Sequence, residues 1–201
     1  MSTANSLAAE DLGSAAQRDR RKRILDATYD LASQGGFDAV QMRAVADSAE
    51  VALGTLYRYF PSKIHLLVSA LGREFERNES AMRAMSIPGD TAAERVIYVM
   101  KRTTRGMQGD PRLTEALTRA FMFADASVAA EIHNVGMHLT TMLTQAIRPG
   151  VDDEPTEQDI AIARVIGDVW LSALMAWVTG RSTAEETAAH VETAVGLLLG
   201  E

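Results

Sequence analysis

Apolar residues recur every three to four positions along most of this 201-residue chain, and glycine, proline or polar clusters separate the runs. This spacing matches the 3.6-residue period of α-helices that bury one face. No segment shows a convincing strand pattern. The chain is therefore predicted to be an all-α protein of about nine helices. The expected helices cover 18–34, 41–49, 52–60, 63–85, 91–108, 111–124, 127–148, 156–179 and 183–199.

Local signals mark where these helices begin and end. The Gly35–Gly36 pair suits the left-handed backbone that follows many helices. Pro61 stops the third helix, and Ser62 can cap the fourth. Two S/T-x-x-E sequences, Thr91–Glu94 and Thr183–Glu186, are capping boxes that predict the starts of later helices.

The same pattern predicts the domain organisation. Residues 1–17 are small and polar without a helical period, which indicates a disordered tail. The fourth helix would span more than ~30 Å, since each helical residue rises 1.5 Å, and this length can join two domains. The short break between the second and third helices, within 41–60, is typical of a helix-turn-helix motif. We therefore expect a DNA-binding domain over 18–78 and a second, ligand-binding and dimerisation domain over 79–201.

Three helices with a short break between the second and third describe a helix-turn-helix. A recognition helix is short and carries small residues where it meets the DNA groove, and Gly54 and Thr55 fit this position. Leu56 and Phe60 are four residues apart and would face the core. The aromatic spacing alone would also fit an ordinary core helix.

Charge is unevenly distributed along the chain. The net charge of −7 would argue against a nucleic-acid partner. Residues 1–78, however, contain ten basic and ten acidic side chains, so residues 79–201 carry the whole excess. Four of the basic residues are consecutive, at 20–23. The N-terminal part can present a basic face on an otherwise acidic protein, although a solvated charge run is equally compatible.

Several side chains around the third helix can contact DNA phosphates. Tyr57 and Tyr59 offer hydroxyls, and Arg58 can reach a phosphate or a base edge. Lys63 lies in the first turn of the fourth helix, where free N–H groups attract anions. This crowding of phosphate-binding groups is typical of a small unit that grips a duplex.

The segment VADSAEVALGTLYRYFPSKIHLL, Val45 to Leu67, resembles the helix-turn-helix motif of TetR-family bacterial transcription regulators. The resemblance is close over 18–78 and architectural over the rest. It implies phosphate contacts from Tyr57, Tyr59 and Lys63, a backbone contact from Arg43, and positions near bases for Thr55 and Arg58. The complete expected DNA-binding set is Arg43, Ala52, Leu53, Gly54, Thr55, Tyr57, Arg58, Tyr59 and Lys63.

Two positions depart from the family motif. Glu50 stands where the family usually has glycine in the turn, so either a non-glycine residue holds a left-handed backbone there or the turn differs. Its charge also opposes nearby phosphates. Ala52 replaces the usual serine or threonine cap and loses a hydroxyl worth ~1 kcal/mol.

The last two helices, 156–179 and 183–199, carry wide apolar stripes. Such stripes can form an intramolecular core. The family resemblance instead implies a four-helix bundle between two copies, and a reader of inverted-repeat DNA requires twofold symmetry. The spacing of Arg164 and Asp168 suggests a surface pair on the first of these helices. The expected dimerisation residues are Val169, Ala173, Trp177, Val191, Val195 and Leu198.

Methionine and aromatic residues are frequent in the middle of the chain. Methionine adapts to irregular apolar shapes, so such a group can line a ligand pocket, although each residue alone fits ordinary helix packing. Phe121 and Trp170 are the preferred candidates. The expected ligand-binding residues are Met82, Tyr98, Met107, Phe121, Met122, Met137, Met142 and Trp170.

Other classes of protein find little support. The chain contains no cysteine, and its four histidines lack the spacing of a metal chelate. Nucleophile, phosphate-loop and dinucleotide motifs are missing, so no enzyme activity, metal or cofactor is expected. The sequence shows no signal peptide and no apolar run of about 18 residues, which favours a cytoplasmic protein without a membrane partner.

Three runs, one of which overlaps the helix-turn-helix segment, resemble actinobacterial TetR-type regulators of sterol (cholesterol) catabolism. They are SAEVALGTLYRYFPSKIHLLVSAL, ALTRAFMFADA and VWLSALMAWVTGR. This resemblance implies a homodimeric repressor that binds inverted-repeat operator DNA and controls sterol and lipid catabolism genes. It also implies an inducer that is a steroid intermediate carried as a coenzyme A thioester. A fatty acyl-CoA or an apolar drug would suit the same pocket, and a ligand-independent DNA-binding module remains an alternative.

Overall fold

The computed structural model describes residues 3–150 and 154–200, and within these ranges all regular secondary structure is helical. The described helices are α1 (Thr3–Ala39), α2 (Met42–Ser48), α3 (Leu53–Tyr59), α4 (Lys63–Arg83), α5 (Ala92–Gln108), α6 (Pro111–Met122), η1 (Ala126–Val128), α7 (Ala129–Ile147), α8 (Glu157–Val178) and α9 (Ala184–Leu199). The prediction of an all-α fold is confirmed.

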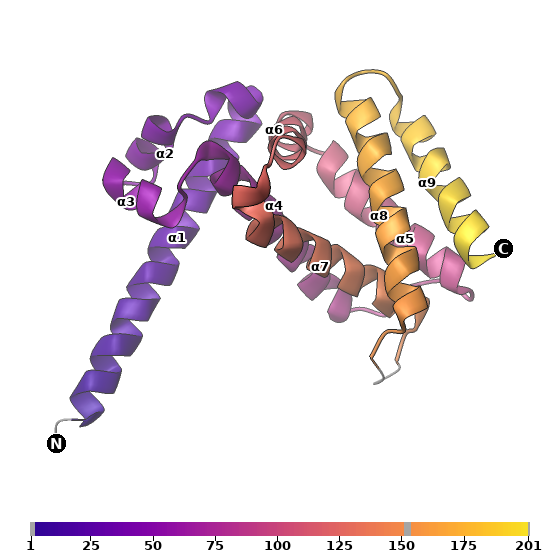
Figure 1. Ribbon diagram of the computed structural model, residues 1–201, viewed down its shortest axis with the longest axis horizontal. Coiled ribbons are helices and arrows are strands. Elements are labelled where there is room, and N and C mark those ends of the chain that lie inside the picture. The colour runs from indigo at the N-terminus through magenta and orange to yellow at the C-terminus, as the bar shows by residue number, and fades with distance from the viewer. Residues whose placement is uncertain (1–2, 151–153, 201) are drawn as a thin grey trace.

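The molecule has a small head and a larger helical body (Figure 1). The head consists of α2 and α3 packed beside α1, and α4 leads from it into the body. In the body, α8 and α9 run side by side at the end farthest from the head. The long connecting helix α4 contacts α1 on one side and α6 and α7 on the other, so it belongs to both parts.

Helix ends occur at the predicted local signals. α1 is interrupted at Gly35 and Gly36, where Gly36 has a φ of 66° that side-chain-bearing residues rarely adopt. The hydroxyl of Ser62 accepts a hydrogen bond from the backbone N–H of His65 and caps α4. Both predicted capping boxes are present, and Thr156 with Asp159 forms a further one at the start of α8.

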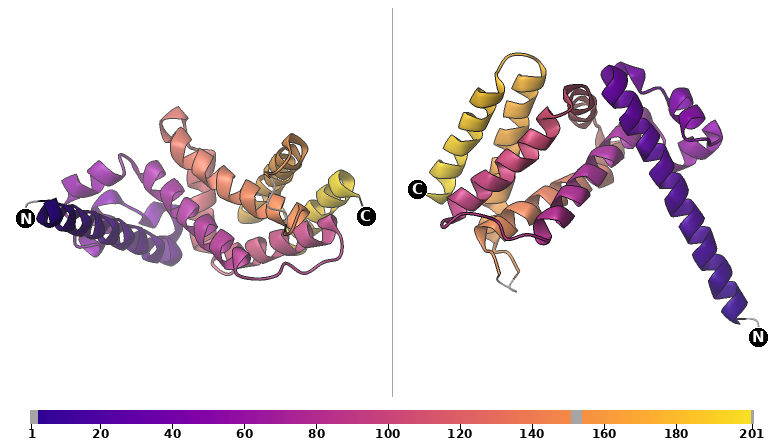
Figure 2. Two further views of the ribbon diagram at one scale, coloured as in Figure 1. Left: turned by 90° about the horizontal axis from the view of Figure 1, so that it is seen from below. Right: turned by 180° about the vertical axis from the view of Figure 1, so that it is seen from behind.

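The start of α1 differs from the expected disordered tail. Residues 3–17 continue the helix as a rod that leads away from the other helices (Figure 2). The segment contains several alanines, the strongest helix formers. Extending an existing helix also avoids the cost of nucleating a new one. Residues 1 and 2 of the expected tail lie outside the described part of the chain.

Buried apolar side chains form a core that is continuous from head to body. Leu56 and Phe60 are buried in the head, as their four-residue spacing predicted. α4 extends this core, since Leu66 and Leu67 are fully buried near its start and Phe75 is buried two turns later. The position of the head relative to the body therefore depends on how α4 packs.

Candidate DNA-binding surface and ligand cavity

The turn between α2 and α3 contains a strained residue. Glu50 has a φ of 53°, and among the described residues it is the only non-glycine with a positive φ. The backbone N–H of Val51 donates to the carbonyl of Ala46 at 3.0 Å and closes the turn. Arg23 of α1 donates to the carbonyl of Ala49 at 2.9 Å. The left-handed alternative for Glu50 is therefore confirmed.

The start of α3 is built without a side-chain cap. Ala52 occupies the N-cap position and makes no side-chain hydrogen bond, as its missing hydroxyl predicted. A Cβ placed on Gly54 would meet no atom of the protein within 4 Å. Internal packing therefore does not require glycine there, and the small residue leaves room for a partner outside the chain.

Most residues of the expected DNA-binding set lie together on the outer side of the head, away from the body (Figure 1). Tyr57 is 46% exposed, which is unusual for a large aromatic side chain. Ala52, Gly54 and Arg58 are also exposed. The remaining members near α3 are partly buried, namely Leu53, Thr55 and Tyr59, whereas Arg43 of α2 is exposed.

Lys63 lies differently from the rest of this set. Its Nζ sits 3.8 Å from the centre of the Phe37 ring, and the guanidinium of Arg119 lies 4.4 Å from the same centre. Burial lowers the pKa of Lys63, and the positive charge of Arg119 also contributes. Lys63 therefore lies partly buried against Phe37, at the contact between head and body.

The residues around Phe37 connect the end of α1 to α6, and we refer to this contact as the α1–α6 joint. The backbone N–H of Phe37 donates to Glu115 Oε2 at 3.0 Å. Arg112 Nη1 donates to the carbonyl of Gln34 at 2.5 Å. The joint comprises Gln34, Phe37, Asp38, Lys63, Arg112, Glu115 and Arg119.

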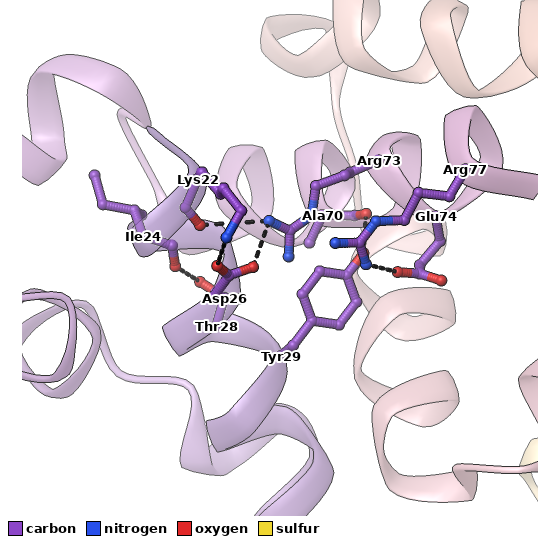
Figure 3. A network of polar contacts seen from close by, with 9 residues as sticks. All are labelled: Lys22, Ile24, Asp26, Thr28, Tyr29, Ala70, Arg73, Glu74 and Arg77. Atoms are coloured by element: carbon purple, nitrogen blue, oxygen red, sulfur yellow. Dashed lines mark hydrogen bonds and ion pairs between the residues drawn. The ribbon is translucent and has the colours of Figure 1, made fainter. Parts of the chain in front are cut away.

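A polar network ties α1 to α4 (Figure 3). Arg73 Nη1 lies 2.8 Å from Asp26 Oδ1, and Lys22 Nζ lies 3.0 Å from Asp26 Oδ2. The Tyr29 hydroxyl donates to the Ala70 carbonyl at 2.6 Å. Burial opposes ionisation of Asp26, but the hydrogen bonds from Lys22 and Arg73 outweigh it and lower its pKa. The network fixes the angle between α4 and the head.

A mainly apolar cavity of about 230 Å³ lies in the body, bounded by helices α4 to α8. Of the eight expected ligand-binding residues, Met107, Phe121 and Trp170 line this cavity, including both preferred candidates. Trp170 packs edge-on against Phe75, with ring centres 6.0 Å apart. α4 contributes Leu71 and Phe75, and α6 contributes Thr118 and Phe121, so two cavity walls are helices that also contact the head.

The other five expected ligand residues lie outside this lining. Met82 and Met142 are buried in the core, and Tyr98 is half-buried on α5. Met122 and Met137 are about half exposed, at 51% and 50%, and lie outside the lining although their neighbours Phe121 and Gly136 belong to it. Side-chain chemistry alone does not reveal which face of a helix points inward when several helices surround the hollow.

Several lining residues were not anticipated from the sequence. The Thr118 hydroxyl is buried and has no hydrogen-bond partner within the described residues. Arg164 and Asp168, expected as a surface pair, are exposed and line the cavity as well. A polar residue on an apolar helical stripe is the only sequence signal that could have suggested Thr118.

The expected dimerisation residues divide into two groups. Val191 and Val195 of α9 and Ala173 of α8 are buried within the monomer. Val169 and Trp177 are half-buried. Leu198 is 36% exposed, and its neighbour Leu197 is 83% exposed. The outer apolar surface of this helix pair therefore includes Leu197, which the sequence analysis did not select.

α8 is also long and apolar enough to cross a membrane by length and composition alone. Only 28% of its most apolar window is buried within the described structure. The same helix carries the charged residues Arg164 and Asp168 near its middle, and charges at that depth of a bilayer are costly. Its exposed face suits a protein partner better than lipid.

A helix-turn-helix head joined to a hollow helical body defines a DNA-binding transcription regulator. The chain belongs to the TetR family of bacterial regulators. Residues 24–70 match the family model described as "Bacterial regulatory proteins, tetR family". Residues 89–198 match the model described as "Tetracyclin repressor-like, C-terminal domain".

Individual relatives agree with this membership. The chain is 58% identical over 198 residues to the HTH-type transcriptional repressor KstR of Rhodococcus jostii, covering 98% of this chain and 91% of that protein. A TetR transcriptional regulator from Rhodococcus sp. RHA1 superimposes with a TM-score of 0.84 at 30% identity, covering 92% and 97% of the two chains. The chain is thus a KstR-like transcriptional repressor and not an enzyme.

A more distant solved structure shares the fold. The Thermus thermophilus repressor FadR, crystallised in complex with lauroyl-CoA, superimposes with a TM-score of 0.71 at 20% identity, covering 90% of this chain and 94% of that one.

Proposed function

We propose that this repressor acts as a cytoplasmic homodimer that binds inverted-repeat operator DNA and is released by an apolar inducer. The main support is the cavity, because two of its walls, α4 and α6, are the helices that also contact the head. A molecule that fills the cavity would press on both connections between body and head. A ligand-independent module would have no use for a hollow at this position.

The inducer is proposed to be a steroid intermediate carried as a coenzyme A thioester, and the regulated genes to serve sterol and lipid catabolism. The resemblance to sterol-catabolism regulators and the identity to KstR repressors support this choice. The apolar lining suits a steroid nucleus, and exposed Arg164 at the cavity suits a phosphate-bearing carrier. Fatty acyl-CoA is the second candidate, because FadR of the same fold was crystallised with lauroyl-CoA.

Dimerisation is proposed to occur through the outer faces of α8 and α9. Leu197, Leu198 and Val165 expose apolar surface on these two helices. Two copies related by a twofold axis would place two α3 helices at the half-sites of an operator, one helical turn of ~34–36 Å apart.

The α1–α6 joint is proposed to carry the response. α6 contributes Thr118 and Phe121 to the cavity and Glu115 and Arg119 to the joint. We call the joint closed when Lys63 is held against Phe37, as it is in this structure, and open when Lys63 has left that ring. A ligand packed against α6 would favour the closed joint, and operator DNA would favour the open joint, in which Lys63 reaches a phosphate.

The direct test is a fluorescence anisotropy titration of the protein on duplexes from its own upstream region, with and without steroid-CoA and acyl-CoA esters. Operator binding that one of these thioesters weakens is expected. Tyr57→Phe should weaken binding to specific and random duplexes alike, because a phosphate contact carries no sequence information. Tyr98→Phe, on the body, serves as the matched control. The absence of binding to any duplex at low salt would refute the proposal.

A further inference from the structure

A second hollow of about 210 Å³ lies in the body between α5 and α9. Ile97 and Met100 of α5 and Ala188 of α9 give it apolar walls. An ion pair between Lys101 and Glu192, with Nζ and Oε1 2.9 Å apart, borders it. None of the residues expected to bind ligand lines this hollow.

One hydrogen-bonded side-chain pair connects the linings of the two hollows. Trp170 lines the first cavity, and its indole Nε1 donates to Thr104 Oγ1 at 2.8 Å. Thr104 lines the second hollow. Met107 and Gln108 are consecutive on α5, and they line the first and the second hollow respectively. The two hollows therefore approach each other along α5, and the Trp170–Thr104 hydrogen bond lies between their linings.

The size of the first cavity limits what it can enclose. A cavity of roughly 150 Å³ holds a single benzene ring, and pockets for drug-sized ligands measure about 300–1,000 Å³. The first cavity, at about 230 Å³, is smaller than that range, whereas the combined volume of the two hollows falls within it. A four-ring nucleus or a long acyl chain needs more room than the first cavity offers.

Each hollow also contains a polar atom without a partner. Thr118 Oγ1 at the first cavity and Gln108 Nε2 at the second are buried and make no hydrogen bond to any described residue. A buried polar group without a partner is costly. An elongated apolar ligand with an oxygen atom near each end would satisfy both groups once their side chains turn toward the hollows.

We infer that Trp170 and Thr104 form a partition that sets the size of ligand the regulator accepts. Small apolar ligands occupy the first cavity with the partition intact. Long or polycyclic ligands with oxygen atoms near both ends bind by breaking the Trp170–Thr104 hydrogen bond and entering the second hollow. The inference rests on the proposed ligand-responsive function and names Thr104 and Trp170 as specificity-determining residues.

The first test compares Thr104→Val with Thr103→Val in the full-length protein. Thr104→Val keeps the side-chain shape but removes the acceptor for Trp170. Thr103 is equally buried and its hydroxyl has no partner among the described residues, so Thr103→Val is the matched control. Dissociation constants are measured for butanoyl-, octanoyl-, dodecanoyl- and hexadecanoyl-CoA. The preference for the longest over the shortest chain should rise roughly three- to tenfold in Thr104→Val and stay unchanged in Thr103→Val.

The second test fills the second hollow and leaves Thr104 and Trp170 unchanged. Ala188→Leu places a larger side chain in the second hollow without touching the first cavity. It should weaken hexadecanoyl-CoA binding at least about tenfold and leave butanoyl-CoA binding unchanged. Equal effects on both chain lengths, or no effect on either, would overturn the partition.

The outcomes separate this inference from the proposed function. If the wild-type protein binds the thioesters and they weaken operator binding, but neither variant changes the chain-length preference, the partition is wrong and the function stands. If the wild-type protein binds neither a steroid-CoA ester nor any of these acyl-CoA esters, the proposed thioester-responsive function fails and the partition fails with it.

Discussion

Glu50 occupies a backbone conformation that glycine adopts without strain, and its carboxylate lies in the helix-turn-helix turn. Glu50→Gly should raise the free energy of unfolding by roughly 0.5–1 kcal/mol, because relief of left-handed strain exceeds the entropy that glycine gains in the unfolded chain. It should also tighten DNA binding, since one negative charge near the phosphates is lost. Urea denaturation and duplex titrations measure the two effects.

Glu50→Gln separates charge from strain in that experiment. Glutamine removes the charge but keeps the Cβ, so DNA binding should tighten with no gain in stability. A stability gain equal to that of glycine would contradict the assignment of strain to this residue.

Asp159 links stability to pH at the start of α8. The Thr156 hydroxyl donates to its carboxylate at 2.6 Å, and Arg148 Nε lies 2.9 Å away, so its pKa is lowered, first by the hydrogen bond from Thr156. Because the folded-state pKa lies below the unfolded value of ~3.9, this stabilisation is present above about pH 4 and is lost as the pH falls through the folded-state pKa.

Asp159→Asn should therefore lower the free energy of unfolding by about 1–2 kcal/mol at neutral pH. The difference from wild type should shrink when the pH is lowered from 7 to a value below the folded-state pKa of Asp159, where the wild-type carboxylate also becomes protonated. Urea titrations at the two pH values check this, and Glu157→Gln, in the exposed first turn of α8, is the matched control. A difference that stays constant with pH would contradict the role of the ionised carboxylate.

At the scale of the helices, α6 lines the cavity and contacts the head, as α4 also does. Arg119→Ala removes one cation from the Phe37 ring, an interaction worth ~0.5–1 kcal/mol at a partly exposed position. The loosened joint should reduce the effect of inducer on operator affinity about two- to fivefold, while inducer affinity for the free protein stays nearly unchanged. Arg102→Ala on α5 is the control. An unaltered inducer response in Arg119→Ala would argue against the joint.

Most helix boundaries could be predicted from the sequence because their causes are local. Gly36 requires a positive φ, and Ser62 and Thr91 cap the residues that directly follow them. The clustering of the expected DNA-binding residues around α3 could be predicted for the same reason, since they are neighbours in the chain. Lys63 is the exception, because its partner Phe37 comes from a different helix and no spacing rule connects the two.

The cavity could be predicted only in part. Its walls come from five helices, so the lining depends on how each helix is rotated in the packed body. Phe121 and Trp170 line the hollow, as expected of large aromatic residues in an apolar pocket. Met122 lies outside the lining although it adjoins Phe121, because a step of one residue on a helix turns the side chain by about 100°.

For the whole molecule, the proposed dimer depends on exposed apolar residues of α8 and α9. Leu197→Asp should yield a folded monomer with at least roughly tenfold weaker operator binding, because a single head contacts only one half-site. Light scattering and duplex titration measure both quantities. Met122→Asp, an equally drastic change at an exposed residue of α6, is the control and should leave the dimer intact. An intact Leu197→Asp dimer would place the interface elsewhere.

Lys63 rests on Phe37, and in the proposed response it turns from this ring to a phosphate when DNA binds. Thermodynamic linkage then works in both directions, because the factor by which inducer weakens DNA binding is also the factor by which DNA weakens inducer binding. Repressor bound at its operator would therefore respond only at a higher inducer concentration than repressor free in solution. The genomic site itself would help to set the threshold of the response.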